Sequence, residues 1–320
     1  MAIKVRDYEV RLTRNKEERR QVRALRYAVF CEEEGAYASE EQKNLREEYD
    51  SFDRFAEYMA VFHNGVVVGC YRIIDREAAE KMGRFYTEGE FNITKIKKVR
   101  GNIAEMSRAC VDVRYRDNAL VMRLLWAGLS EYVLRRKVRV LFGVASWVGQ
   151  KPGLSAHAIS YLYYNRLAPA RLRATVLTEN FHESINPALS RMNIMPKIFV
   201  DEEEALRQMP PLMKGYLRVG ADFGNGVFID KSFNTYDVFV TLQTKNISAT
   251  YQKHFLGREN ALEYLDVYID EGAVKTLGKI VLFPVRGPLK VLGSFVKFML
   301  REDAADAEYF EDSVDNEPEQ

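Results

Sequence analysis

The spacing of hydrophobic positions changes period several times along the first half of this chain. Residues 8–14 (YEVRLTR) alternate apolar and polar side chains and predict a strand. Residues 16–35 place apolar side chains at helical spacing and end at a glycine, which predicts a helix. Two apolar runs in residues 57–74 flank an Asn64-Gly65 pair, and this pattern predicts a β-hairpin.

The middle of the chain continues with alternating strand and helix patterns. Residues 102–133 predict a strand, a turn and then a helix, and residues 139–148 (RVLFGVASWV) predict a fully apolar strand. Residues 153–167 predict another helix, and residues 227–244 predict two strands. This order indicates an α+β (α/β-like) fold with a central mixed, twisted sheet flanked by helices.

Composition narrows the class of protein. The chain has 320 residues, 47% of them hydrophobic, which is enough for a substantial core. We expect no secretory signal, because the first residues lack an apolar centre, and no apolar run reaches the ~18–20 residues that span a bilayer. Cys31, Cys70 and Cys110 fit a reducing cytoplasm and have no metal-ligand spacing. We therefore expect a cytoplasmic protein without a bound metal.

The net charge of +1 conceals an asymmetry. Nine acidic residues and no basic residue lie between Glu302 and Gln320, so the rest of the chain holds 47 basic residues against 37 acidic ones. A basic body predicts an anionic partner, such as nucleic acid, acidic lipid or an acidic carrier protein. Nucleic acid is disfavoured, because no recognition motif or aromatic pairing accompanies the basic residues.

Charged residues interrupt the predicted strand within residues 102–113. Glu105 and Arg108 stand three positions apart, where they could form an ion pair at a sheet edge or take part in chemistry. Arg114 and Arg116 follow in the turn, just before the predicted helix. A helix N-terminus attracts phosphate groups, so this basic turn is a candidate phosphate site.

Strand, basic turn and helix form the arrangement with which the Gcn5-related N-acyltransferase (GNAT) superfamily holds a pantetheine pyrophosphate. The turn resembles that motif, although Asn118 and Ala119 stand where the superfamily usually has glycines. The resemblance implies acyl-pantetheine contacts from Val111, Val113, Arg114, Arg116, Asn118 and Ala119.

Longer segments resemble two GNAT branches that use acyl carrier protein. The segments LRYAVFCEEEG, EYDSFDRFAEYMAVFHNGVVVGCYRII, GRFY and EMSRACVDVRYR are similar both to acyl-homoserine-lactone synthases and to ornithine N-acyltransferases of ornithine-lipid synthesis. Residues 210–242 (PPLMKGYLRVGADFGNGVFIDKSFNTYDVFVTL) resemble only the ornithine branch. The likeness covers about residues 5–255 and implies a GNAT fold.

This resemblance implies transfer of a 3-hydroxyacyl chain from acyl carrier protein to the α-amine of an amino acid. Ornithine is the favoured acceptor, with a lyso-ornithine lipid as product. The donor would be the acyl-phosphopantetheine of the carrier protein, with acyl-CoA as an alternative, and no cofactor is expected to stay bound. Alternatives are acylation of glycine or another amino acid, synthesis of a homoserine-lactone-type signal, or non-catalytic binding of carrier protein or membrane.

The resemblance also implies a set of charged site residues. Glu105 is the predicted general base, and Arg108 beside it is expected to keep the carboxylate ionised and to orient it. Residues predicted to bind the substrate are Arg26, Phe30, Asp50, Asp53 and Arg72. The arginines would bind the substrate carboxylate, and the aspartates would attract the amino group or hold the arginines. Taken alone, Arg26 and the aspartates equally suit a solvated surface.

Basic residues near the mouth of the pantetheine site are expected to attract the acidic carrier protein. The candidates are Lys95, Lys97, Lys98, Arg100, Arg135, Arg136, Lys137 and Arg139.

The sequence predicts three regions: an N-acyltransferase domain (1–250), a basic amphipathic extension (251–301) and a disordered acidic tail (302–320). Basic residues in 274–301 recur on one helical stripe, and prolines there predict two short helices. This stretch would either contact the inner face of the cytoplasmic membrane or pack on the domain.

Overall fold

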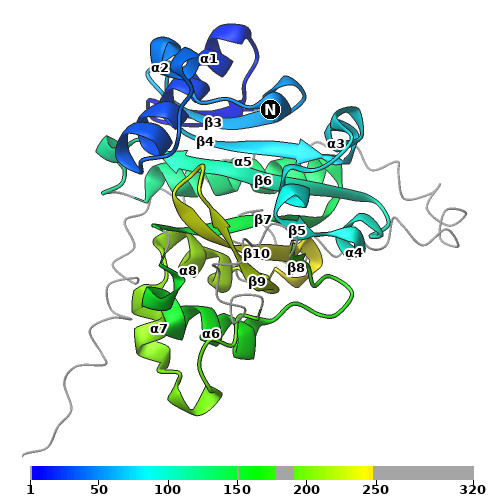
Figure 1. Ribbon diagram of the computed structural model, residues 1–320. Helices are drawn as coiled ribbons and strands as arrows, with labels where there is room; N and C mark the ends of the chain where they lie inside the picture. Colours follow the sequence, from blue (N-terminus) through cyan, green and yellow to red (C-terminus); the bar gives the residue numbers. More distant parts are fainter. Residues whose placement is uncertain (1, 118, 150, 178–190, 248–320) are drawn as a thin grey trace, which may run out of the picture.

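The computed structural model describes residues 2–117, 119–149, 151–177 and 191–247, which form a large mixed sheet with helices on both faces (Figure 1). The predicted fold class is confirmed.

Some predictions fall outside the described residues. These are the extension at 251–301 with its membrane contact, the acidic tail at 302–320, and Asn118 of the basic turn. Within the described part of the chain, no helix is both long enough and apolar enough to cross a bilayer.

The sheet has the strand order β1-β2-β3-β4-β6-β7-β10-β9-β8-β5. Neighbouring strands are antiparallel, except for the parallel pairs β6–β7 and β8–β9. The strands are β1 (Ile3–Val5), β2 (Tyr8–Leu12), β3 (Glu57–His63), β4 (Val66–Asp75), β5 (Phe91–Asn92), β6 (Asn102–Val111), β7 (Val138–Val148), β8 (Thr175–Val176), β9 (Asp222–Asp230) and β10 (Thr235–Gln243).

Helices cover both faces of this sheet. They are α1 (Lys16–Arg26), α2 (Glu40–Leu45), α3 (Arg76–Met82), α4 (Thr94–Lys97), α5 (Leu120–Arg136), α6 (Ala156–Arg166), α7 (Glu202–Gln208) and α8 (Pro211–Arg218). Val61 of β3 packs in one core with Leu125 of α5, whereas the adjacent Ala60 packs in another with Val22 of α1. Because side chains alternate across a strand, α1 and α5 lie on opposite faces.

The strands and helices predicted from hydrophobic spacing are confirmed. Asn64 and Gly65 have φ angles of 50° and 81°, as a tight hairpin turn requires. The many charged side chains of residues 37–55 favour a solvent-exposed loop, but the segment is not a loop throughout. It contains α2, which begins at a capping box of Ser39 and Gln42, and a short 3₁₀ turn at Ser51–Arg54. Such short helices bury too few apolar residues to produce a period.

The parallel ladder between β6 and β7 stops halfway along both strands. It ends where Met106 of β6 faces Gly143 of β7, and from Val144 onward β7 pairs with β10 only. A Cβ atom at Gly143 would lie 2.2 Å from the carbonyl oxygen of Met106. Glycine therefore permits the close approach of the two backbones just before they part.

β6 also carries a β-bulge. Its register with β4 shifts between Cys70 and Arg72, because β6 has one extra residue there. Arg108 lies in this bulge with a φ of 53°, which is uncommon for a residue with a side chain. The extra residue reverses the alternation of side chains, so Arg108 and Glu105 both reach Tyr86 although three positions separate them.

We expect Gly143→Ala to destabilise the protein by about 1–3 kcal/mol, because the methyl group collides with backbone rather than with a movable side chain. Urea unfolding measures this change. Gly153→Ala is the matched control, since a Cβ atom at Gly153 meets no atom within 4 Å. Equal unfolding midpoints for the two variants would contradict the tight contact.

Candidate active site

Six charged side chains form one buried network on the face of the sheet that α1 covers. Three are arginines, from α1, β4 and β6, and three are acids from the segment between α2 and β3. They are Arg26, Arg72, Arg108, Glu48, Asp50 and Asp53. Their formal charges cancel, which is the usual condition for holding ions in a protein interior.

Arg26 lies at the centre of this network and is fully buried. It donates to both carboxylate oxygens of Asp53 at 2.9 and 3.1 Å, and to Glu48 through Nε and Nη2. Its Nη1 also lies 3.4 Å from the hydroxyl of Tyr58. The guanidinium is therefore engaged with protein groups along both of its edges. Its predicted contact with the substrate carboxylate stays a prediction.

Arg72 is fully buried too, but its guanidinium is not completely paired. Nη1 donates to both oxygens of Asp50 at 2.7 Å and to Asp53 at 3.1 Å, and Nε donates to Ser107 at 3.0 Å. Nη2 is buried and has no hydrogen-bond partner among the described residues. An unpaired guanidinium nitrogen is costly inside a protein, so a ligand oxygen would be favourable there.

Arg108 closes the network beneath two aromatic rings. Its guanidinium lies 4.6 Å from the ring centre of Tyr86 and 4.1 Å from that of Phe233, which belongs to the β9–β10 turn. It donates to Asp50 at 3.1 Å and lies 3.4 Å from Glu48. Cation–π contacts of this kind hold the arginine in place.

Glu105 is fully buried and is held by the segment that follows α3. Its carboxylate accepts hydrogen bonds from the backbone N–H of Tyr86 at 2.8 Å, from that of Thr87 at 3.0 Å and from the Thr87 hydroxyl at 2.8 Å. Three fixed donors determine the orientation of the carboxylate.

This geometry corrects the role predicted for Arg108. Arg108 was expected to orient Glu105 and keep it ionised, but it is engaged with Glu48 and Asp50, and Glu105 takes its hydrogen bonds from the Tyr86–Thr87 segment. Burial raises the pKa of Glu105 above its usual value, although hydrogen bonds from Thr87 and the charge of Arg72 act in the opposite direction. A raised pKa suits a carboxylate that accepts a proton near neutral pH.

The remaining substrate-binding candidates lie beside the same network. Burial raises the pKa of Asp53, but Arg26 and Arg72 outweigh burial and hold it below its usual value. Asp50 is the most exposed member, with 25% of its side chain accessible. Phe30 packs edge-on against the ring of Phe233, with centroids 5.9 Å apart.

Several residues of this site were not anticipated from the sequence. Glu48 stands in a run of charges that looks like surface, and Ser107 is an ordinary strand residue. Tyr86 and Phe233 lie in segments that carry the family resemblance, but neither residue was given a role there. Contacts that join residues so far apart in the chain leave no local pattern, so only the fold reveals them.

The candidate pantetheine turn lies at the C-terminal end of β6. Arg114 is exposed and pairs with Asp112 at 2.6 Å, and Arg116 pairs with Glu33. Ala119 precedes α5 without a side-chain cap. Two valines were predicted to contact pantetheine. Val111 is buried, and Val113 is 61% exposed.

The basic residues expected around the pantetheine mouth lie at the opposite end of β6, so that prediction was wrong. They precede β6, end α5 or begin β7, and the ten residues of β6 separate them from the turn by roughly 30 Å. Helix α5 reverses the chain direction between parallel strands, which places its basic end there. A cavity of about 440 Å³ at this end is lined by Lys95, Lys98, Arg139, Arg171 and Lys245, among others.

We expect Asp53→Asn to lower the free energy of unfolding by about 3–5 kcal/mol, because it leaves two buried arginines short of a counter-charge. Chemical denaturation at pH 7 measures the loss. Since the folded pKa of Asp53 is lowered, its contribution is present above about pH 4 and disappears as the pH falls below that value. The difference in the free energy of unfolding between variant and wild type should therefore narrow as the pH falls below about 4.

The control for this prediction is Glu77→Gln, which removes an exposed ion pair with Lys81. We expect this variant to unfold like the wild type. An equal loss of unfolding free energy in Glu77→Gln and Asp53→Asn would contradict a special role for the buried network.

Comparison with known proteins identifies a domain family and several relatives of this chain. A family model described as an acetyltransferase (GNAT) domain matches residues 25–127. An L-ornithine N(alpha)-acyltransferase of Agrobacterium fabrum is 33% identical over 258 residues, covering 78% of this chain and 85% of the relative. The enzyme of the same name from Rhodobacter capsulatus is also 33% identical, covering 78% of this chain and 95% of the relative.

Solved structures similar to this chain include the acyl-homoserine-lactone synthase LasI, with 15% identity and a TM-score of 0.43 over 79% of this chain and 96% of LasI. Another is FeeM, an N-acyl amino acid synthase from uncultured soil microbes, with 11% identity and a TM-score of 0.41 over 80% of this chain and 97% of FeeM. From the sequence relatives, the chain belongs to the L-ornithine N(alpha)-acyltransferase family, and its residues 25–127 match the GNAT domain.

Proposed function

We propose that this protein transfers a (3-hydroxy)acyl chain from the thioester of acyl carrier protein to the α-amine of L-ornithine, giving a lyso-ornithine lipid. The curated relatives support the acceptor, since their name specifies L-ornithine. The observation that carries the proposal is the buried carboxylate of Glu105, next to Met106, where the β6–β7 ladder ends.

The acyl donor would bind where β6 loses its partner. Beyond Met106, Ser107, Cys110 and Val111 of β6 pair with β4, and in the described part of the chain no residue of 107–111 pairs with β7. An extended pantetheine arm can take the place of the missing strand, because backbone N–H groups there remain available. The same N–H groups would polarise the thioester carbonyl and stabilise the oxyanion that forms during attack.

The acceptor would bind against the charged network. The unpartnered Nη2 of Arg72 is a favourable contact for the α-carboxylate of an amino acid. Asp50, the most accessible acid of the network, would attract the α-ammonium group. These two contacts would position the nitrogen beside the thioester.

The reaction then needs two proton transfers. The α-ammonium group first loses a proton to Glu105 through an intervening water, and Glu105 later returns it to solvent. The neutral amine attacks the thioester carbon, and the C–N bond forms as the C–S bond breaks. The second proton leaves the nitrogen and protonates the departing thiolate.

The carrier-protein donor is supported by the exposed basic turn after β6. The phosphate of phosphopantetheine would compete with Asp112 and Glu33 for Arg114 and Arg116, since guanidinium groups bind phosphate well. Acyl-CoA is the alternative donor, and contact of residues 274–301 with the membrane stays a prediction.

We expect Glu105→Gln to lower kcat by about 10²–10⁴-fold, the range typical of losing a general base. Purified protein is incubated with 3-hydroxyacyl carrier protein and single amino acids, including ornithine and glycine, and products are identified by mass spectrometry. In the wild type, kcat should fall as the pH drops through the raised pKa of Glu105, and the variant should lose this dependence.

Glu17→Gln serves as the control, because Glu17 forms an exposed pair with Arg20 outside the six-charge network. Binding of the acyl carrier protein is measured in parallel, together with thermal melting to exclude unfolding. A wild-type protein that binds the carrier protein but never transfers its acyl chain would favour a non-catalytic binding function.

A further inference from the structure

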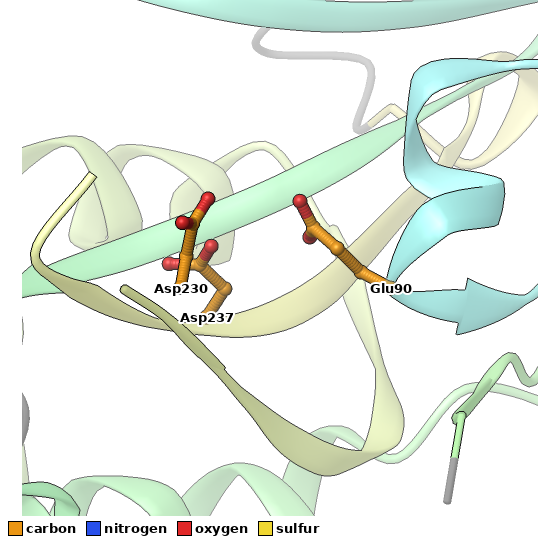
Figure 2. Close-up of side chains that lie close together, drawn as sticks. All are labelled: Glu90, Asp230 and Asp237. Atoms are coloured by element: carbon orange, nitrogen blue, oxygen red, sulfur yellow. The ribbon is translucent and has the colours of Figure 1, made fainter. Parts of the chain in front are cut away.

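Three buried carboxylates form a second acidic group beside the network. Asp230 ends β9, Asp237 lies in β10, and Glu90 follows the 3₁₀ turn at Tyr86–Gly89. Figure 2 shows the three side chains converging, and their nearest carboxylate oxygens all lie within 4.8 Å of one another. None is more than 8% exposed.

These acids are incompletely satisfied. Oε2 of Glu90 and Oδ1 of Asp237 are buried without a hydrogen-bond partner among the described residues. The same holds for the hydroxyl of Thr235, which is 5% exposed. Thr235 pairs with Asp230 across the β9–β10 hairpin and lies two residues before Asp237, so its side chain is on the same face. Unpartnered oxygens of Glu90 and of β10 thus lie near the carboxylate of Asp230, which itself accepts from the backbone N–H groups of Ser232 and Phe233.

The electrostatics of this group favour a cation. Burial raises the pKa of Glu90 well above its usual range, and the neighbouring Asp237 and Asp230 raise it further. Burial likewise raises the pKa of Asp237 to about 7, with Asp230 acting in the same direction and the hydroxyl of Ser146 acting against it. A cation among the three would remove the cost of clustering negative charge.

The acidic group lies close to the candidate active site. Thr87, which holds Glu105, is three residues from Glu90, and the backbone N–H of Glu90 donates to the Thr87 carbonyl at 3.0 Å. Glu105 and Arg108 both influence the pKa of Glu90. The guanidinium of Arg108 lies over the ring of Tyr86, and Glu90 and Asp230 both raise the pKa of the Tyr86 hydroxyl.

We propose that Glu90, Asp230 and Asp237 bind the side-chain ammonium group of the acceptor amino acid. This inference rests on the proposed function. The six-charge network is already neutral, so it offers no surplus negative charge for a second ammonium group. Ornithine carries one such group three methylene units from its α-carbon, and the acidic group beside the site supplies the matching charge.

The test compares ornithine with norvaline, which has the same carbon chain without the terminal amine. We expect the wild type to prefer ornithine by about 30-fold or more in kcat/KM, the loss typical of removing one partner of a buried charge pair. Glu90→Gln and Asp237→Asn should bring this preference close to one, mainly by raising the KM for ornithine. Asp222→Asn, at the other end of β9, is the matched control and should keep the preference.

Binding is also measured without an acyl donor, by calorimetry and by the shift in melting temperature on adding ornithine or norvaline. Ornithine should bind more tightly than norvaline to the wild type, and the difference should shrink in both acidic-group variants. Using two variants guards against one that fails to fold. This arm still tests the acidic group if no acyl transfer to any amine is found, which would refute the proposed function alone.

Equal use of ornithine and norvaline by an active wild-type enzyme would overturn the inference while leaving the proposed function intact. Carboxylate oxygens also bind divalent cations. The binding measurements are therefore repeated after treatment with EDTA and after adding Mg²⁺ or Ca²⁺. Loss of the ornithine preference with EDTA and its return with metal would assign the acidic group to a metal ion and overturn the inference as well.

Discussion

Guanidinium groups in an apolar interior must be neutralised where they lie, and this constraint organises the N-terminal half of the molecule. Arg26, Arg72 and Arg108 come from three different elements, yet their counter-charges come from the single segment 48–53. That segment must therefore fold against the sheet rather than remain in solvent. The same contacts leave one buried nitrogen of Arg72 without a hydrogen-bond partner among the described residues and 25% of the Asp50 side chain exposed.

Two irregularities of β6 place chemistry next to this network. The bulge at Arg108 turns its side chain to the face of Glu105, and the end of the β6–β7 ladder at Met106 leaves the backbone beside both without a β7 partner. A regular strand would point Arg108 into the core against α5, and a complete ladder would occupy the backbone N–H groups. The unusual backbone angle at Arg108 is thus explained by its result, because it places the Arg108 side chain on the face that carries Glu105.

The C-terminal half takes part in the same site through the β9–β10 hairpin. Its turn brings Phe233 onto the guanidinium of Arg108 and against Phe30, and its strands bring Asp230 and Asp237 to Glu90. This explains why a segment so far along the chain accompanies the N-terminal motifs: both halves build one set of contacts.

The sequence by itself determined the order of the main strands and helices, the mixed sheet, the family, and five of the six charged residues that meet in the buried network, all but Glu48. Those follow from local periodicity and from motifs that can be read along the chain. Only the tertiary structure decided that Arg108 pairs with Glu48 instead of orienting Glu105, and that the basic run before β6 lies away from the pantetheine turn. A bulge, a ladder end and a crossover helix set these positions, and each depends on contacts between residues far apart in sequence.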